Sequence, residues 1–275
     1  MAKNIFIGVN NVAKKPKNIY VGVNGVARKV KAAYVGVNGV ARKVWPNTLL
    51  PDTYKRVEYI SNATVRGGPN YMPHIKTGVN PDPYTKVYIK YMYANTTDSF
   101  GHHYIFCATE RLDDWTPSFG YSMNNGGSIS YPNHALQYVF FNRSSSEYHG
   151  PNNSWEQNQF DHVNKLYEVL FNDSGKFYLN NQLIHTATDV SGSTINYPIR
   201  IFNTYETTTY DKPGMVRVYS FKIWKNNTTL VRDFYPCYRK SDNVNGLYDI
   251  VNNQFYSNAN TDHPEDIARG PEIDG

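Results

Sequence analysis

The sequence predicts an all-β protein. Its 275 residues include 24 Tyr, 13 Phe and 4 Trp, and the chain is also rich in Asn, Thr and Ser. This composition favours strands and polar turns over helices. Short strand-like runs between residues 54 and 225 are separated by clusters of Asn, Gly, Pro and Asp. Many short strands with a turn every 8 to 12 residues or so, about the spacing seen here, indicate a β-sandwich or barrel.

The N-terminal region contains one 14-residue unit three times, without an insertion. The copies are residues 4–17, 18–31 and 32–45, and read NIFIGVNNVAKKPK, NIYVGVNGVARKVK and AAYVGVNGVARKVW. Each copy has two apolar runs on either side of Asn-Gly, or of Asn-Asn in the first. Asn-Gly between alternating segments is a strong hairpin signal, because a type I′ turn needs positive φ at both central residues. The repeat therefore predicts three tandem β-hairpins.

The packing of these hairpins is left open by the sequence. With a turn at Asn24-Gly25, Val23 is expected to face Val26, and Val21 is expected to face Arg28. A lone two-stranded hairpin is marginal in water, so the three must pack on one another or on other chains. The first interpretation is a six-stranded meander that caps the next domain. The second is an attachment or oligomerisation module.

Charge is segregated between the repeats and the rest of the chain. Residues 1–51 contain nine Lys or Arg and no Asp or Glu. The whole chain has 28 basic and 23 acidic residues, so the remainder has 19 against 23, a formal charge of −4. A basic arm on a mildly acidic body predicts docking to an acidic surface, whether a protein, a teichoic-acid-like polymer or nucleic acid. The residues expected to serve this attachment are Tyr20, Arg28, Lys29, Tyr34, Arg42 and Lys43.

Two later runs, KVYIKYMY and VRVYSFKIW, alternate as half-buried strands do. In the first run, Val87 and every second residue up to Tyr93 share one face. The run KFYLNNQLI predicts a hairpin with Asn180-Asn181 as its turn, and Pro236 favours an edge strand. The two faces expected in the second run are Val216, Val218, Ser220, Lys222 and Trp224 against Arg217, Tyr219, Phe221 and Ile223.

Neither the cysteines nor the apolar runs indicate a disulfide framework or a membrane span. Cys107 and Cys237 lie in apolar-aromatic strand contexts, where two buried thiols are expected and a bridge between them is the alternative. No apolar run reaches about 18 residues, so no transmembrane helix is expected. No signal-peptide pattern is visible at the N-terminus, and we expect synthesis in the cytoplasm.

A set of segments between residues 54 and 258 reads YKRVEY, IKTGV, KFYLNNQLIHTAT, YPIRIFN and VRVYSFKIWKNNTTLVRDFYPCYRKSDNVNGLYDIVNNQFYSN. Together these segments resemble the concanavalin A-like, laminin-G-type jelly-roll domains of phage and prophage structural proteins. The GVNGVARKV repeat is similar to one carried by virion proteins of phages of Gram-positive bacteria. Together the matches cover most of residues 1–258. The resemblance implies a jelly roll of two antiparallel sheets with a concave face, in a tail, baseplate, fibre or capsid-decoration protein.

The resemblance and the repeat together predict four segments. The C-terminal segment is acidic and turn-rich, and it is either loosely attached or in contact with the basic arm of a neighbouring copy. The segments are 1–46, the hairpin repeats; 47–53, a linker; 54–258, the jelly roll; and 259–275, the acidic tail.

No pattern for catalysis or metal binding is found. Glucanases of the concanavalin-like fold use a Glu-x-Asp-x-x-Glu strand with carboxylates about 5–5.5 Å apart for retention, and this pattern does not occur here. The nearest acidic cluster, Glu110, Asp113 and Asp114, is expected to lie in a loop. His102 and His103 are adjacent and would point to opposite faces of a strand. We therefore expect no enzyme activity and no cofactor, with a loop calcium ion at Asp113 or Asp114 as the alternative.

Three loop-rich regions combine residue types that suit a glycan site. A sugar needs aromatic rings for its apolar face and amides or carboxylates for its hydroxyl groups, and such residues gather around 113–115, 121–125 and 148–155. The alternative is that these rings cover the edges of the core. The candidate ligand-binding residues are Asp113, Asp114, Trp115, Tyr121, Asn124, Tyr148, Asn153 and Trp155.

The resemblance implies a bacteriophage virion structural protein, made in the cytoplasm of the host bacterium and located in the virion. Its partners are expected to be other virion proteins and further copies of itself, with a trimer favoured and nucleic acid disfavoured. The jelly roll is expected to bind a glycan of the host surface without membrane insertion. The main alternative is a capsid or tail decoration protein that stabilises the particle without a ligand. A glycan hydrolase is a third, less favoured function.

Overall fold

The all-β class is confirmed by the computed structural model, in which every described element is a strand except the 3₁₀ turn Pro264–Asp266. The chain divides into two units, residues 1–51 and residues 52–274, which are treated separately below. The described residues are 7–9, 12–14, 20–23, 25–30, 33–37, 40–45, 50–62, 73–93, 102–108, 119–124, 135–139, 164–187, 194–202 and 216–273.

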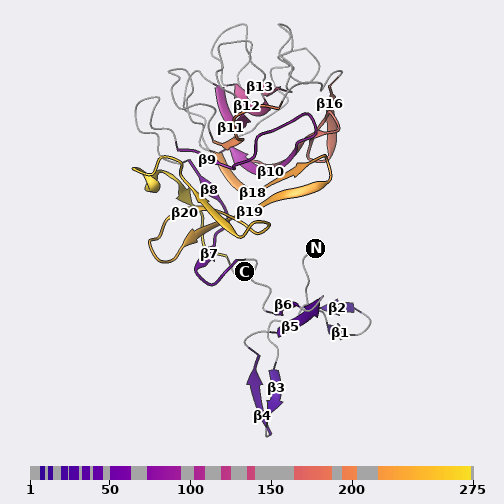
Figure 1. The fold of residues 1–275 in the computed structure, drawn as a ribbon, viewed down its shortest axis with the longest axis vertical. Helices are drawn as coiled ribbons and strands as arrows, with labels where there is room; N and C mark the ends of the chain where they lie inside the picture. Colours follow the sequence, from indigo (N-terminus) through magenta and orange to yellow (C-terminus); the bar gives the residue numbers. More distant parts are fainter. Residues whose placement is uncertain are drawn as a thin grey trace. The chain divides into compact units, whose positions relative to one another are not determined.

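The N-terminal unit, called the arm here, contains three two-stranded antiparallel sheets (Figure 1). The pairing expected around Asn24-Gly25 is observed, because Val23 lies opposite Val26 and Val21 lies opposite Arg28. Gly25 has a φ of +77°, as a type I′ turn requires. The six described strands form separate sheets and not one six-stranded meander. They are β1 Ile7–Val9 and β2 Val12–Lys14, β3 Tyr20–Val23 and β4 Val26–Lys29, and β5 Ala33–Val37 and β6 Val40–Trp45.

The larger unit is built on an eleven-stranded antiparallel sheet. Its main path is β16-β15-β14-β10-β18-β19-β20-β21 (Figure 1). Three short strands complete it, because β7 pairs with β19, and β8 pairs with both β18 and β22. The strands are β7 Tyr54–Arg56, β8 Ile60–Ser61, β10 Lys86–Tyr93, β14 Leu166–Asp173, β15 Lys176–Leu179, β16 Gln182–Thr186, β18 Val216–Lys225, β19 Thr229–Arg239, β20 Asn245–Asp249, β21 Gln254–Ser257 and β22 Ala268–Arg269.

A five-stranded antiparallel sheet forms the second layer of this unit, in the order β13-β12-β11-β17-β9. Strands β11 and β12 contribute Ile105, Phe106 and Phe119, which are all fully buried. The strands are β9 Ile75–Lys76, β11 His102–Ala108, β12 Phe119–Asn124, β13 Ala135–Val139 and β17 Arg200–Ile201.

Aromatic rings from both layers form the core between them. The Phe106 ring of β11 lies 5.5 Å from Phe171 of β14 and 5.7 Å from Phe221 of β18, between ring centroids. Phe119 of β12 lies 4.8 Å from Phe171. All three contacts are edge-to-face, a geometry worth about 0.5–1.5 kcal/mol per pair beyond the area buried. The two sheets therefore pack face to face, and the larger unit is a β-sandwich.

The alternation expected in β10 is confirmed, but the alternation expected in β18 is wrong. In β10, Val87 and every second residue up to Tyr93 are buried. In β18, a β-bulge places Lys90 opposite Ser220 but Tyr91 opposite Val218, so that Tyr219 is an extra residue in the ladder. Because of this extra residue, the side chains that point to the core alternate in one phase before the bulge and in the opposite phase after it. The residues buried there are Val216, Val218, Phe221 and Ile223.

Two turn-related expectations have different outcomes. The hairpin of β15 and β16 is confirmed, because Leu179 pairs with Gln182 and both Asn180 and Asn181 have positive φ, at 50° and 65°. Pro236, in contrast, does not lie on an edge strand, since β19 has β20 along one side. On its other side β19 pairs with β18 up to Phe234 and with β7 from Cys237 onward. Pro236 lies at the change of partner, where a missing N–H costs no ladder bond.

The C-terminal segment is docked on the sandwich. Strand β22 pairs with β8, and Val57 forms an isolated antiparallel bridge with Glu272. The N–H of Ala259 donates to the carbonyl of His74 at 2.8 Å, and Ile267 is fully buried. The loose attachment considered from the sequence is therefore wrong for the described residues of this segment, and a contact with the arm of a neighbouring copy stays a prediction.

Both cysteines are buried, and no disulfide joins them. Burial is the main reason why the pKa of the Cys237 thiol is raised to about 12. Within the described residues, no helix is long and apolar enough to cross a membrane.

Candidate functional site

Of the eight ligand-binding candidates, only Tyr121 has a described side chain, and it is not at the surface. Tyr121 is fully buried, and its hydroxyl lies 2.7 Å from the hydroxyl of Tyr91 in the opposite sheet. Burial raises the pKa of both phenols, so both stay protonated at neutral pH. Tyr121 is therefore a core residue and not part of an exposed aromatic platform. Asn124 ends β12, opposite His102, and the six others, Asp113, Asp114, Trp115, Tyr148, Asn153 and Trp155, lie outside the described residues.

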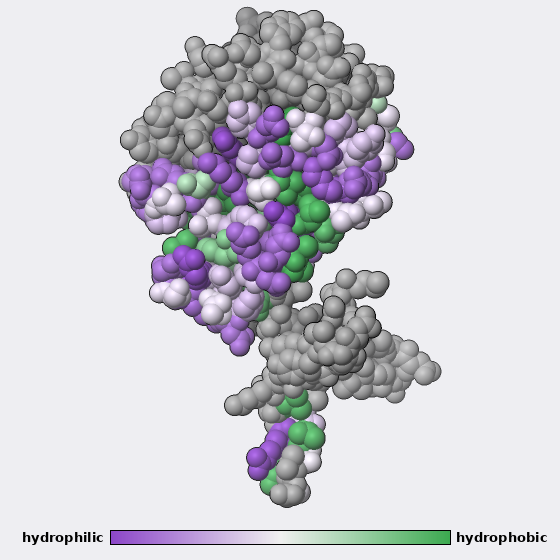
Figure 2. All heavy atoms as spheres, in the orientation of Figure 1, coloured by the Kyte–Doolittle hydropathy of each residue, from purple (hydrophilic) through white to green (hydrophobic). Residues whose placement is uncertain are grey.

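The attachment candidates of the arm lie on its strands. In hairpin β3–β4, Tyr20 is 58% exposed and Arg28 is also exposed. On the same hairpin, Val21 and Val26 are 51% and 58% exposed. Figure 2 shows green hydrophobic atoms beside purple hydrophilic ones on this hairpin, at the bottom of the view. The remaining candidates are Lys29 on β4, Tyr34 on β5, and Arg42 and Lys43 on β6.

A pocket of about 250 Å³ lies on the larger sheet, on the face opposite the aromatic core, called the outer face here. Cross-strand pairing explains why its residues meet, since Tyr88 of β10 pairs with Leu170 of β14, and Leu170 pairs with Tyr178 of β15. Directly paired residues project from the same face of a sheet. We call this site the outer-face pocket, and its lining residues are Tyr88, Glu168, Val169, Leu170, Tyr178 and Asn181.

Glu168 is the only charged lining residue, and its carboxylate is held from two sides. Lys90 Nζ donates to Glu168 Oε1 at 2.8 Å, and Tyr88 also hydrogen-bonds to this carboxylate. The bond from Lys90 is the largest cause of a lowered Glu168 pKa. Burial, followed by the negative charge and hydrogen bond of Glu168, raises the pKa of Tyr88 to about 12. At neutral pH the pocket lining therefore includes an ionised carboxylate, paired with Lys90 next to the pocket, and a neutral phenol.

The turn between β15 and β16 fixes one end of the pocket. Asn180 in that turn donates its backbone N–H to the carbonyl of Glu168 at 2.7 Å. Its side-chain Oδ1 accepts the N–H of Glu168 at 2.9 Å. Asn180 thereby extends the β14–β15 ladder beyond the last strand pair, and Asn181 is held at the pocket next to it.

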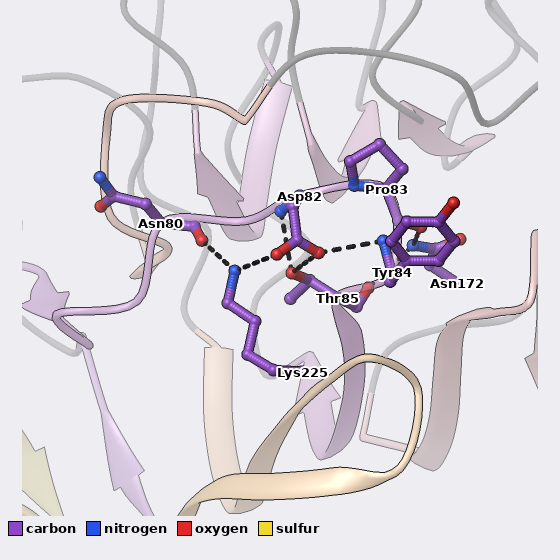
Figure 3. A network of polar contacts seen from close by, with 7 residues as sticks. All are labelled: Asn80, Asp82, Pro83, Tyr84, Thr85, Asn172 and Lys225. Carbon is purple, nitrogen blue, oxygen red and sulfur yellow. Dashed lines mark hydrogen bonds and ion pairs between the residues drawn. The ribbon is translucent and has the colours of Figure 1, made fainter.

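A second polar cluster, drawn in Figure 3, lies where the loop before β10 meets the end of β18. Lys225 Nζ donates to Asp82 Oδ2 at 2.6 Å and to the carbonyl of Asn80 at 2.7 Å. Thr85 Oγ1 and the N–H of Tyr84 donate to Asp82 Oδ1 at 2.9 and 3.0 Å. Partial burial would raise the pKa of Asp82, but Lys225 and these hydrogen bonds together lower it.

Asn172 ties the same loop to strand β14. It is buried, and its Nδ2 donates to the carbonyls of Pro83 and Thr85 at 3.0 and 2.8 Å (Figure 3). Since both oxygens of Asp82 already have partners within the chain, we assign this cluster a structural role. It fixes the loop that leads into β10, the strand that carries Tyr88.

Within the described part of the chain, no group of three or more His, Cys, Asp or Glu gathers as a metal-binding cluster. The residues considered for calcium, Asp113 and Asp114, lie outside it. No protein-family model matches this chain, and no curated protein matches it either.

The outer-face pocket was missed by sequence reasoning. The alternation of KVYIKYMY predicts the buried face of this strand, whereas Tyr88 and Lys90 lie on its other face. A signal was present in the sequence, because Tyr88 alternates with Lys86 and Lys90 on the less buried face of an amphipathic strand. The pairing of Tyr88 with Leu170 and of Leu170 with Tyr178 depends on the strand order β10-β14-β15, which the sequence does not state.

Proposed function

We propose that this chain is a structural protein of a bacteriophage virion that acts by binding. In this proposal the arm attaches the protein to the particle, and the sandwich is displayed to bind a glycan of the host surface. The sandwich would be a concanavalin A-like jelly roll, a topology that the resemblance of residues 54–258 supports. The two face-to-face antiparallel sheets are consistent with it.

The observation that carries this proposal is the difference in charge and in exposed apolar surface between the two units. Residues 1–51 have nine basic and no acidic residues, while the remainder of the chain is mildly acidic. In hairpin β3–β4, Val21 and Val26 are more than half exposed. A two-stranded hairpin has too little buried surface for independent stability, so contact with other chains would supply what it lacks. The sandwich has a core of its own and needs no such partner.

Solution mass tests the role of the arm. We would measure the full chain and residues 52–275 by light scattering, each at about 0.15 M salt, where charges further apart than about 8 Å are screened. A full chain that is trimeric, with a monomeric truncated chain, is the expected result. An oligomer of equal size in both forms would place the association in the sandwich and contradict the arm's role. Two monomers would contradict self-assembly, and would favour a decoration protein whose arm binds only the particle.

A further inference from the structure

We propose that the outer-face pocket is a binding site for a neutral glycan. The pocket combines apolar rings, a fixed carboxylate and a turn amide on one sheet face, and its one charged lining residue is already paired with Lys90. This inference rests on the proposed display function and deepens it, because it assigns the site and the chemical class of the ligand.

The floor of the pocket suits the apolar face of a sugar ring. Tyr178, Leu170 and Tyr88 are consecutive cross-strand partners, and all three are half-buried, so part of each side chain faces solvent. Neighbouring strands are about 4.8 Å apart, which places the two tyrosines about 10 Å apart across the sheet. Leu183, paired with Tyr178, continues the row and is 49% exposed. An elongated ligand lying across the strands would bury its C–H groups against this row.

The polar groups at the pocket suit hydroxyl groups. Glu168 accepts hydrogen bonds from Lys90 and Tyr88, and an ionised carboxylate has further acceptor positions. Asn181 adds an amide with donors and an acceptor. The Lys90 bond and the Asn180 turn hold Glu168 before a ligand arrives, so little ordering cost remains for binding.

The charged groups nearest the pocket are paired with one another, and this pairing favours a neutral ligand. The Glu168 carboxylate is matched by Lys90, and two flanking lysines on the same face are also paired. Lys222 Nζ lies 3.2 Å from Asp233, and Lys86 Nζ lies 3.1 Å from Asp173. An anionic polymer would meet the Glu168 carboxylate. The exposed lysine of β15, Lys176, lies opposite Asp173 and not beside Glu168. The arm, which has no acidic residue, is the part of the chain suited to such a polymer.

The test is glycan binding by the full chain. The probes are an array of neutral oligosaccharides and polysaccharides, with poly(glycerol phosphate) as the anionic comparison, at about 0.1 and 0.5 M salt. Calorimetry on the strongest neutral ligand then compares wild type with Tyr178→Thr and Asn181→Gly. Threonine suits a strand, and glycine suits the positive φ of Asn181, so both variants keep the backbone. Tyr84→Thr, which removes a 60% exposed ring outside the pocket lining, is the matched control.

The expected result is a neutral ligand whose Kd changes less than about twofold between the two salt concentrations. We expect Kd to rise about tenfold or more in Tyr178→Thr, and to rise less in Asn181→Gly. Tyr84→Thr should leave Kd unchanged.

Three outcomes overturn the inference in distinguishable ways. Neutral binding that both pocket variants retain would place the site elsewhere and leave the proposed function intact. Binding to poly(glycerol phosphate) alone, weakened by salt, would replace the ligand class and implicate the arm. Absence of binding to every probe would contradict the proposed display function together with the pocket.

Discussion

The two units of this chain differ in whether their strands share a hydrophobic core. In the sandwich, sixteen strands contribute to two sheets that bury a common set of rings, with Phe106 in contact with partners on both β14 and β18. In the arm, the described strands pair only two by two, and Val21 and Val26 remain more than half exposed. A fold whose strands share a core has stability of its own. From this difference we expect the order of the arm to depend on what it contacts, and the order of the sandwich not to.

Charge follows the same division. In the sandwich, lysines are matched to carboxylates across strands and loops, as Lys225 is to Asp82 and Lys90 is to Glu168. The sequence of the arm offers no carboxylate side chain to its nine basic residues. Its counter-charges must therefore come from outside the arm.

The largest expected effect on the free energy of unfolding comes from core packing, which the sandwich has and the arm hairpin lacks. Phe171→Ala removes a ring that contacts Phe119 at 4.8 Å and Phe106 at 5.5 Å, and should lower the free energy of unfolding by about 3–5 kcal/mol. Val26→Ala, in the exposed face of the arm hairpin, should change it by less than about 0.5 kcal/mol. Urea denaturation followed by far-UV circular dichroism measures both. Comparable losses for the two variants would show that the arm shares the cooperative unit of the sandwich.

A buried carboxylate gives the next largest effect. Asp249 is fully buried, and its Oδ1 accepts the backbone N–H groups of Asp233 and Val251, each at 3.0 Å. Asp249→Ala leaves these donors without their acceptor and should cost about 1–3 kcal/mol. Asp249→Asn keeps an acceptor oxygen and should cost less. If the two variants have equal midpoints in the same denaturation experiment, hydrogen bonding is not what Asp249 supplies.

A turn substitution made in both units sharpens the comparison further. Asn180→Ala places a Cβ-bearing residue without a side-chain acceptor at a φ of 50°, and should destabilise the sandwich by about 1–2 kcal/mol. Gly25→Ala adds a Cβ at a φ of +77° in the arm. It should leave the unfolding midpoint of the sandwich unchanged, because the turn shares no core with it. Thermal melts of both variants check this, and Asn180→Gly, which tolerates the φ, should recover part of the loss.

The smallest expected effect concerns acid. Because the pKa of Asp82 is lowered in the folded state, its charge stabilises the sandwich above the ordinary aspartate value of about 3.9. That contribution is lost as the pH falls through the lower folded-state pKa. Asp82→Asn should therefore be less stable than wild type at pH 7, by less than about 1 kcal/mol, and the difference should shrink by pH 3. Melting temperatures of the two proteins at pH 7, 5 and 3 measure this difference in stability. A difference that grows toward pH 3 would show that the charge of Asp82 does not stabilise the folded state.

Local rules predicted the parts of the fold that depend on neighbouring residues. The Asn180-Asn181 turn and the buried face of β10 followed from residue type and a two-residue period. The same period failed in β18, because the bulge at Tyr219 inserts a residue that only the partner strand β10 reveals. A clue was present, since Val216, Val218, Phe221 and Ile223 keep a common face only if one residue is skipped.

The candidate site was harder to predict, because it depends on strand order. The polar neighbours of Tyr121 predict a surface ring, yet β12 faces the larger sheet and buries the ring against Tyr91. Tyr88 and Tyr178 are far apart in the sequence and meet only because β14 lies between their strands. Periodicity identifies two faces of a strand, but which face meets a second sheet is settled by long-range packing.

The docking of β22 on β8 has a consequence for how the protein is made. Ser61 pairs with Ala268, and the N–H of Glu58 donates to the carbonyl of Pro271 at 2.9 Å. At a synthesis rate of about 5–20 residues per second, β8 leaves the ribosome on the order of ten seconds or more before its partner exists. During that interval β8 is an open edge on a nascent chain. The sandwich therefore closes only after residues near 270 have emerged, and nascent chains that end before them are the ones most exposed to edge-to-edge aggregation.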